Sequence, residues 1–187
     1  MRITGGQAKG RALAGPKTNN MRPTSDQVKE AIFNIIGHDL QGFLVLDLFS
    51  GTGSLGLEAL SRGATKTVFV DKAQESGTLI RKNIKRCGFE GLGIILRRDL
   101  LKGLSSIPLQ DRKAFDLVFL DPPYGKGFLQ PMLKQLAEGD LLAPMAQVVA
   151  ESSKNEALPS SIGRLRMIKS KTYGDTRLTL FINEEEK

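Results

Sequence analysis

The chain has 187 residues, of which 40% are hydrophobic and 25% charged, so it can form one domain with a complete core. One cysteine and one histidine leave no internal disulfide, no zinc site of the usual ligand types and no supported Ser-His-Asp triad. No apolar run is long enough to cross a bilayer, and the N-terminus lacks the apolar core of a signal peptide. We therefore expect a cytoplasmic protein with no metal and no membrane partner.

Positive charge is concentrated at the start of the chain. The formal net charge is +7, and residues 1–22 hold five basic side chains and no acidic one. Glycines in the same stretch favour a short hairpin around Gly5-Gly6. We expect residues 1–22 to form a basic arm that contacts a ribose-phosphate backbone, in preference to a solvated tail. Residues 23–187 are then the main domain.

The first predicted helix begins at the end of this arm. Thr24 and Gln27 have the spacing of a capping box. Apolar residues then recur with helical spacing from Val28 to Ile36, and Gly37 ends the run.

Buried strands and helices alternate through the rest of the chain. The predicted strands are nearly continuous apolar runs and cover residues 44–49, 67–71, 93–96, 116–121 and 147–151. The predicted helices between them cover residues 55–60, 73–87 and 129–136. Residues 165–171 and 177–182 alternate apolar and polar side chains around a turn at 173–175, which predicts an antiparallel hairpin. The expected fold class is α/β, with a mostly parallel, doubly wound sheet and a C-terminal hairpin.

A glycine motif follows the strand at residues 44–49. Gly51, Gly53 and Gly56 have the spacing GxGxxG, between that strand and the next helix. Glycine permits a tight turn there and lets a ligand approach the backbone closely. The motif alone also fits dinucleotide binding, because Asp71 lies twenty residues beyond Gly51, where such a site places its ribose-binding acid.

Acidic residues at the strand ends favour a cationic ligand. Asp47, just before the glycine loop, would repel a pyrophosphate, whereas it complements the ammonium and sulfonium groups of S-adenosylmethionine. Asp71, at the end of the second strand, can accept hydrogen bonds from both ribose hydroxyls. Asp99, after the third strand, is placed for the adenine amino group, with a helix N-cap as the open alternative. The predicted cofactor is S-adenosyl-L-methionine.

The tetrapeptide Asp121-Pro122-Pro123-Tyr124 ends the fourth strand, where ligands of open α/β sheets bind. The exocyclic amine of a base is a poor nucleophile, because its lone pair is delocalised into the ring. The Asp121 carboxylate and the Pro122 carbonyl can accept its two N–H groups, and Tyr124 offers a face for stacking. The candidate catalytic residues are therefore Asp121, Pro122 and Tyr124, in a direct methyl transfer that relies on positioning and electrostatics.

Along nearly its whole length the sequence resembles the RsmD family of bacterial ribosomal RNA methyltransferases, which methylate the N2 amine of a guanine in 16S rRNA. The matching stretches are RITGG (2–6), KGR (9–11), RPT (22–24), VKEAIFN (28–34), LDLFSGTG (46–53), LGLEALSRGA (55–64) and DPPY (121–124). The N-terminal stretches are the discriminating ones, because the glycine loop and DPPY are shared with DNA adenine methylases and many other methyltransferases.

The resemblance implies a class I S-adenosylmethionine-dependent methyltransferase fold, which is Rossmann-like and has seven strands, with a small N-terminal extension. The residues expected to bind the cofactor are Asp47, Phe49, Ser50, Gly51, Gly53, Asp71, Lys72, Asp99, Leu100 and Asp121. The residues expected to contact RNA are Arg2, Lys9, Arg11, Arg22 and Thr24. The implied partner is ribosomal RNA within an assembling small subunit, and we expect the protein to act as a monomer.

Three other functions stay open at this point. A DNA adenine-N6 methyltransferase would share the chemistry, although this short chain leaves little room for a target-recognition region. An NAD-linked oxidoreductase fits the glycine loop and Asp71 but leaves DPPY and the basic arm unexplained. An inactive RNA-binding module is the third. The choice of guanine over adenine rests on the resemblance alone.

Overall fold

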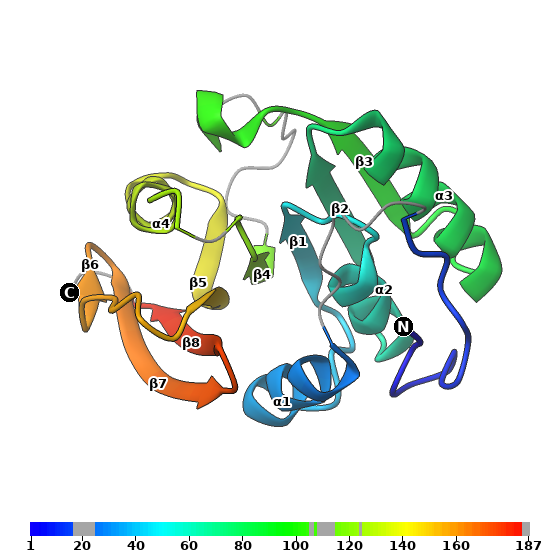
Figure 1. Cartoon of the computed structure of the whole chain (residues 1–187), viewed down its shortest axis with the longest axis horizontal. Coiled ribbons are helices and arrows are strands. Elements are labelled where there is room, and N and C mark those ends of the chain that lie inside the picture. Colours follow the sequence, from blue (N-terminus) through cyan, green and yellow to red (C-terminus); the bar gives the residue numbers. More distant parts are fainter. Residues whose placement is uncertain (17–24, 105–106, 108–114, 124, 185–187) are drawn as a thin grey trace.

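The computed structural model describes residues 1–16, 25–104, 107, 115–123 and 125–184. Its elements, in chain order, are α1 (Asp26–Ile36), β1 (Leu44–Leu48), α2 (Ser54–Ser61), β2 (Lys66–Asp71), α3 (Gln74–Cys87), β3 (Gly93–Arg97), the 3-10 helix η1 (Leu100–Lys102), β4 (Phe115–Leu120), α4 (Leu129–Glu138), β5 (Leu142–Ser153), β6 (Ser161–Ile162), β7 (Leu165–Tyr173) and β8 (Thr176–Asn183). All these strands form one sheet, in the order β3-β2-β1-β4-β5-β8-β7-β6 (Figure 1).

The sheet has a parallel half and an antiparallel half. Strands β1 to β5 pair in parallel, whereas β8 runs antiparallel to β5 and forms the predicted hairpin with β7. The predicted α/β class with a C-terminal hairpin is thereby confirmed. The eighth strand, beyond the seven that the resemblance implies, is β6, which has two residues and pairs with β7.

Two apolar layers cover the two faces of the sheet. Helices α1, α2 and α3 pack on one face, around Phe33, Leu57 and Phe69. Helix α4 packs on the other face, around Leu133 and Phe181 (Figure 1). Burial on both faces explains why the parallel strands are continuous apolar runs in the sequence and not alternating ones.

Helix α1 begins one residue later than the predicted capping box requires. Ser25 is its N-cap, and the Ser25 hydroxyl accepts a hydrogen bond from the Val28 N–H at 3.2 Å. The prediction of a cap at Thr24 is therefore wrong, because the cap is Ser25, whose hydroxyl accepts from the third residue of the helix. Thr24 itself lies outside the described residues. Gly37 ends the helix as predicted.

Strand β5 is longer than the predicted strand at residues 147–151. It has 12 residues, because Leu142 also pairs with Phe115 of β4, across an irregularity in the register. Met145 adopts a positive φ of 61° within this irregular part. Such a break interrupts the regular pattern of apolar residues, so the sequence alone indicated only the regular end of the strand.

Residues 1–16 pack against the main body of the protein. They fold back through a single antiparallel bridge between Arg2 and Ala12, which is the form that the predicted hairpin takes. They also bury Ile3, Ala8 and Leu13 in the same apolar cluster as α1 and α2. In Figure 1 this segment runs beside α2 and α3. A solvated tail is therefore excluded for these residues.

Glu58 on α2 fastens this N-terminal segment. Its fully buried carboxylate accepts hydrogen bonds from the Thr4 N–H at 2.8 Å and the Gly5 N–H at 2.7 Å. Lys29 Nζ of α1, also fully buried, lies 3.3 Å from Glu58 Oε2, and Arg62 Nη2 lies 2.9 Å from Oε1. Both carboxylate oxygens thus have the charged and hydrogen-bonded partners that a buried ion needs.

We expect Glu58→Gln to lower the free energy of unfolding by about 3–5 kcal/mol, because the buried ammonium of Lys29 loses its nearer and fully buried counter-charge. Urea unfolding followed by circular dichroism measures this. The matched control is Glu138→Gln, which removes an exposed ion pair with Lys134 and should change stability by less than about 1 kcal/mol. Equal effects of the two substitutions would contradict the anchoring role of Glu58.

Candidate cofactor and base-binding site

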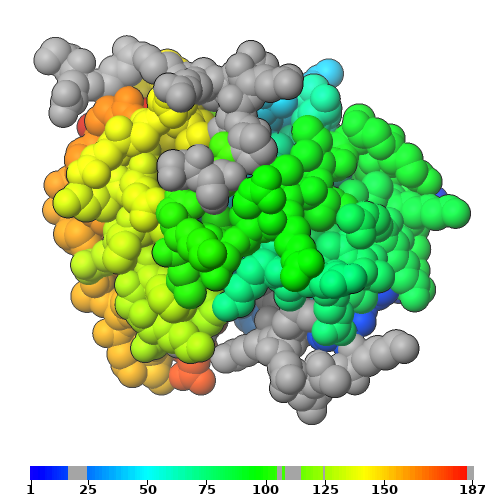
Figure 2. Space-filling model, turned by 90° about the horizontal axis from the view of Figure 1, so that it is seen from above, coloured from blue at the N-terminus to red at the C-terminus, as the bar shows by residue number. Residues whose placement is uncertain are grey.

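The carboxyl-terminal parts of the central strands are in register with one another. Leu48 of β1 pairs in register with Val70 of β2 and with Leu120 of β4, and Leu120 pairs with Ala150 of β5. The residues that follow these positions therefore meet at one edge of the sheet, which Figure 2 views from above. The strand order reverses between β1 and β4, and ligands of open α/β sheets bind at such a switch point.

The glycine loop leaves β1 in a tight turn that is tied to β2. The Ser50 N–H donates to the Val70 carbonyl at 3.1 Å, and the Gly53 N–H donates to the Ser50 carbonyl at 2.6 Å. Phe49 has a positive φ of 58° and packs, half-buried, against the apolar cluster around α4. Gly53 is the N-cap of α2 with φ 77°, a conformation that strains residues with a side chain. The loop thus has the form that the GxGxxG spacing predicts.

Asp47 lies beneath this loop. Its side chain is 2% exposed, and its Oδ2 accepts a hydrogen bond from the Gly56 N–H at 3.0 Å. A Cβ on Gly56 would lie 2.9 Å from that oxygen and 2.4 Å from the Phe69 ring, so the position has no room for a side chain. Burial raises the pKa of Asp47 to about 7; the bond from Gly56 lowers it in part, and the charge of Asp71 raises it further. Asp47 therefore fastens the loop, and its contact with a cofactor stays a prediction.

Asp71, the last residue of β2, holds two backbone segments at once. Its Oδ2 accepts a hydrogen bond from the Gly51 N–H at 2.9 Å, and its Oδ1 accepts one from the Ala73 N–H at 2.8 Å. Each carboxylate oxygen has a second lone pair, so hydrogen bonds from two ribose hydroxyls are still possible. The ribose role of Asp71 stays a prediction. Its structural role at the loop was not predicted from the sequence.

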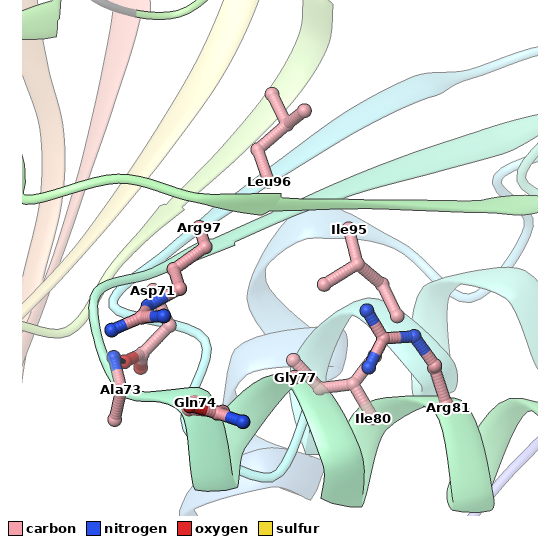
Figure 3. Close-up of a pocket in the computed structure, with 9 residues that line it drawn as sticks. All are labelled: Asp71, Ala73, Gln74, Gly77, Ile80, Arg81, Ile95, Leu96 and Arg97. Carbon is pink, nitrogen blue, oxygen red and sulfur yellow. Dashed lines mark hydrogen bonds between the residues drawn. The ribbon is translucent and has the colours of Figure 1, made fainter.

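A hollow of about 380 Å³, open in part to solvent, lies beside Asp71, between β3 and the start of α3 (Figure 3). Ile95 points from β3 toward Gly77 of α3 in this hollow. Arg97 pairs in register with Asp71, and its Nε donates to the Lys72 carbonyl at 3.2 Å. The Lys72 side chain, which we expected at the cofactor, is exposed. The sequence reasoning missed Arg97, although its place at the end of an apolar strand was a usable signal.

Asp99 caps the 3-10 helix η1. Its Oδ1 accepts a hydrogen bond from the Leu101 N–H at 3.2 Å, which is the alternative that the sequence left open. Leu100 is buried in the apolar cluster around α4. The Leu104 N–H donates to Gln135 Oε1 at 2.8 Å, so the segment around η1 lies against α4, as Figure 2 shows. Contacts of Asp99 and Leu100 with adenine stay predictions.

The proline turn follows β4 at the same edge of the sheet. Asp121 is half-buried, Pro122 is buried and Pro123 is exposed, whereas Tyr124 lies outside the described residues. The two prolines line a second hollow together with Glu151 of β5. Glu151 follows Ala150, the last residue of β5 that pairs with β4. The sequence reasoning missed Glu151 as a site residue. A carboxylate after a run of apolar residues was the available signal.

The residues of this edge fit the predicted cofactor. Ser50 Oγ, in the glycine loop, is buried and has no hydrogen-bond partner among the described residues. A buried hydroxyl without a partner is costly, so a polar ligand atom at the loop would stabilise it.

Across the described part of the chain, no group of three or more His, Cys, Asp or Glu side chains could hold a metal ion. No helix of that part is long and apolar enough to cross a membrane.

The residues predicted to contact RNA fall into two groups. Arg2, Lys9 and Arg11 have exposed side chains on the N-terminal segment. The Arg2 side chain lies 3.6 Å from a carboxylate of α1, and Arg11 Nη1 donates to a carbonyl of α3 at 2.6 Å. Arg22 and Thr24 lie outside the described residues. RNA contact stays a prediction for all five.

The pKa of Asp47 predicts a pH dependence of stability. The folded protein binds more protons than the unfolded chain between pH 3.8 and about 7, so the free energy of unfolding falls as the pH rises through this window. The decrease is at most roughly 4 kcal/mol, at 1.36 kcal/mol per pKa unit. Asp47→Asn keeps an acceptor for the Gly56 N–H and should lose this part of the pH dependence. Urea unfolding between about pH 4 and pH 8 measures it, and parallel profiles for parent and variant would contradict it.

Comparison with known proteins shows the family. The family described as Conserved hypothetical protein 95 matches residues 1–182. The protein YlbH of Bacillus subtilis is 36% identical over 97% of this chain and 98% of its own length. Ribosomal RNA small subunit methyltransferase D of Haemophilus influenzae is 33% identical, over 98% of this chain and 94% of its own length. The protein of the same name from Escherichia coli K12 is 30% identical, over 100% of this chain and 91% of its own length.

Solved structures share the fold. A conserved hypothetical protein of Streptococcus pyogenes matches with a TM-score of 0.77 at 38% identity, over 84% of this chain and 96% of its own. An RNA methyltransferase from Salinibacter ruber, in complex with S-adenosyl-L-homocysteine, matches with a TM-score of 0.67 at 20% identity, over 89% of this chain and 96% of its own, which concerns the fold alone. The chain therefore belongs to the Conserved hypothetical protein 95 family, the RsmD family of S-adenosylmethionine-dependent methyltransferases that its N-terminal stretches resemble.

Proposed function

We propose that this protein transfers the methyl group of S-adenosyl-L-methionine to the exocyclic N2 amine of a guanine in small-subunit ribosomal RNA. One observation carries the proposal: the glycine loop after β1 and the proline turn after β4 follow neighbouring strand ends, because Leu48 and Leu120 are in register. A donor held by the loop and a base held by the turn would meet at the switch point of the sheet. The names of the Haemophilus influenzae and Escherichia coli relatives support ribosomal RNA as the substrate.

On the cofactor side, S-adenosyl-L-methionine supplies a methyl group on a positively charged sulfur. The Ser50 hydroxyl and the backbone of Gly51 and Gly53 would hold the methionine end, and Asp71 would accept hydrogen bonds from the ribose. Asp47, with a pKa of about 7, is partly ionised near neutral pH and adds negative charge below the loop. The other residues that we assign to this pocket are Phe49, Lys72, Asp99, Leu100 and Asp121.

On the base side, three residues position the amine. The Asp121 carboxylate and the Pro122 carbonyl would each accept one N–H of the amine, which favours a localised lone pair on nitrogen. The two prolines restrict the backbone and so fix the direction of that carbonyl. Tyr124 would stack on the base. No covalent intermediate with the protein is needed, so positioning and electrostatic stabilisation supply the acceleration.

The N-terminal segment is the proposed RNA-binding surface. Glu58 fastens it to α2, the helix that begins at the glycine loop. The position of the segment relative to the cofactor pocket is therefore fixed. Arg2, Lys9 and Arg11 present exposed cations for phosphate groups. The partner would be ribosomal RNA in an assembling small subunit, which a monomer would meet in the cytoplasm.

The reaction is tested with labelled S-adenosyl-L-methionine and small-subunit particles from cells that lack the protein. We expect label at the N2 position of a guanine, located by mass spectrometry of the ribosomal RNA. Label in naked duplex DNA and none in the particles would instead support a DNA adenine methyltransferase. Thermal stabilisation by NAD, but not by S-adenosyl-L-homocysteine, would support an oxidoreductase.

We expect Asp121→Asn to lower kcat by roughly 10²-fold or more, because one acceptor of the reacting amine is weakened. The melting temperature should change little, since the two side chains have the same shape. Asp39→Asn, which alters an exposed acid in the loop after α1, is the matched control. An unchanged kcat in Asp121→Asn would contradict the catalytic role of Asp121. RNA binding without any turnover by the parent protein would favour the inactive RNA-binding module.

Reversal of three charges tests the RNA-binding surface. Replacing Arg2, Lys9 and Arg11 together by Glu should weaken RNA binding, and it should flatten the slope of log affinity against log salt by roughly 2 to 3. Lys169→Glu, an exposed site on β7, should leave the slope unchanged. Because Arg2 and Arg11 also contact the protein, the melting temperature of each variant is measured in parallel. Unchanged RNA binding would show that the segment is not an RNA contact.

A further inference from the structure

Glu151 lies on the base side of the site, and the mechanism above does not use it. It follows Ala150 of β5 as Asp121 follows Leu120 of β4, and Ala150 and Leu120 are in register. Its side chain is 8% exposed and lines the hollow that Pro122 and Pro123 border. Neighbouring strands of a sheet lie about 4.8 Å apart, so the Glu151 and Asp121 side chains leave adjacent points of the backbone on this side of the site.

The backbone of Glu151 is held on both sides. Strand β5 pairs in parallel with β4 and antiparallel with β8, where Glu151 stands opposite Leu178. Glu156 lines the same hollow, but it is half-buried and lies beyond the end of β5. Side chains on paired strands hold a position better than side chains on connecting segments. Of the two carboxylates, Glu151 is therefore the one suited to select a ligand.

The hydrogen-bonding edge of guanine explains what such a carboxylate would recognise. Guanine has an N1–H donor beside its N2 amine, whereas adenine has an acceptor at N1. If Asp121 and Pro122 accept the two N–H groups of the amine, the N1–H is left beside it without a partner. An ionised carboxylate only accepts hydrogen bonds, so it complements this remaining donor. Bases that are taken out of a nucleic-acid stack are commonly read on this edge.

We propose that Glu151 selects guanine by accepting a hydrogen bond from its N1–H. This inference rests on the proposed function and adds a specificity-determining residue to it. A base with an N1 acceptor would place a lone pair against the carboxylate, and the two would repel each other. Sites that hydrogen-bond a particular group discriminate strongly against analogues that lack it.

The test uses the full-length protein and small-subunit particles reconstituted with guanine or 2-aminopurine at the methylated position. The analogue keeps the N2 amine but has an acceptor at N1. The parent protein should prefer guanine by at least tenfold in kcat/KM. Glu151→Gln should reduce this preference at least tenfold, because a Gln amide can donate to the N1 acceptor. The two substrates compete for the same enzyme, so the ratio of their kcat/KM values does not depend on the fraction of the protein that is folded.

Two further variants complete the design. Glu151→Asp, which keeps the carboxylate, should retain the preference for guanine, and Glu138→Gln on the surface of α4 should leave it unchanged. An unaltered preference in Glu151→Gln, or a shift in Glu156→Gln instead, would overturn the role of Glu151 while the proposed function stands. If the parent protein methylates neither particle, the proposed function itself fails, and the two failures are thus distinguished.

Discussion

The common register of the central strands is the constraint on which the site depends. Because Leu48 of β1 is in register with β2 and β4, and Leu120 of β4 with Ala150 of β5, the glycine loop, Asp71, the proline turn and Glu151 share one edge of the sheet. A slip of one residue in any strand would turn its side chains to the opposite face. The apolar layers on both faces oppose such a slip, since it would move each close-packed side chain into a position shaped for a different one. The packing of the core therefore also fixes the geometry of the site.

Helix α2 links that edge to the N-terminal segment. Its first turn carries the glycine loop, which Asp47 fastens through Gly56, and its middle carries Glu58, which fastens residues 1–16. The two buried carboxyl groups are accommodated differently. Glu58 is compensated by the cations of Lys29 and Arg62, whereas Asp47 accepts one N–H and its pKa rises to about 7. A disturbance of the N-terminal segment would thus reach the loop through one short helix.

The elements were predictable wherever a local pattern was strong. Apolar runs identified the parallel strands, and the glycine spacing identified the loop, because both effects depend on neighbouring residues only. The helix cap was assigned to Thr24 in place of Ser25, and β5 was predicted too short, because an adjacent hydroxyl and an irregular pairing leave no distinct pattern. Glu151 was missed for another reason: its relation to the proline turn exists only across two paired strands.

By itself, the sequence determined the α/β class, the order of the elements and the residues of the two motifs, since periodicity and spacing are local properties. It also indicated the family through its N-terminal stretches. Only the tertiary structure decided which atoms the acids contact: Asp47 holds Gly56, Asp71 holds the loop, and Asp99 caps η1. These partners depend on how strands and helices that are distant in the chain pack together, and no spacing in the sequence encodes that directly.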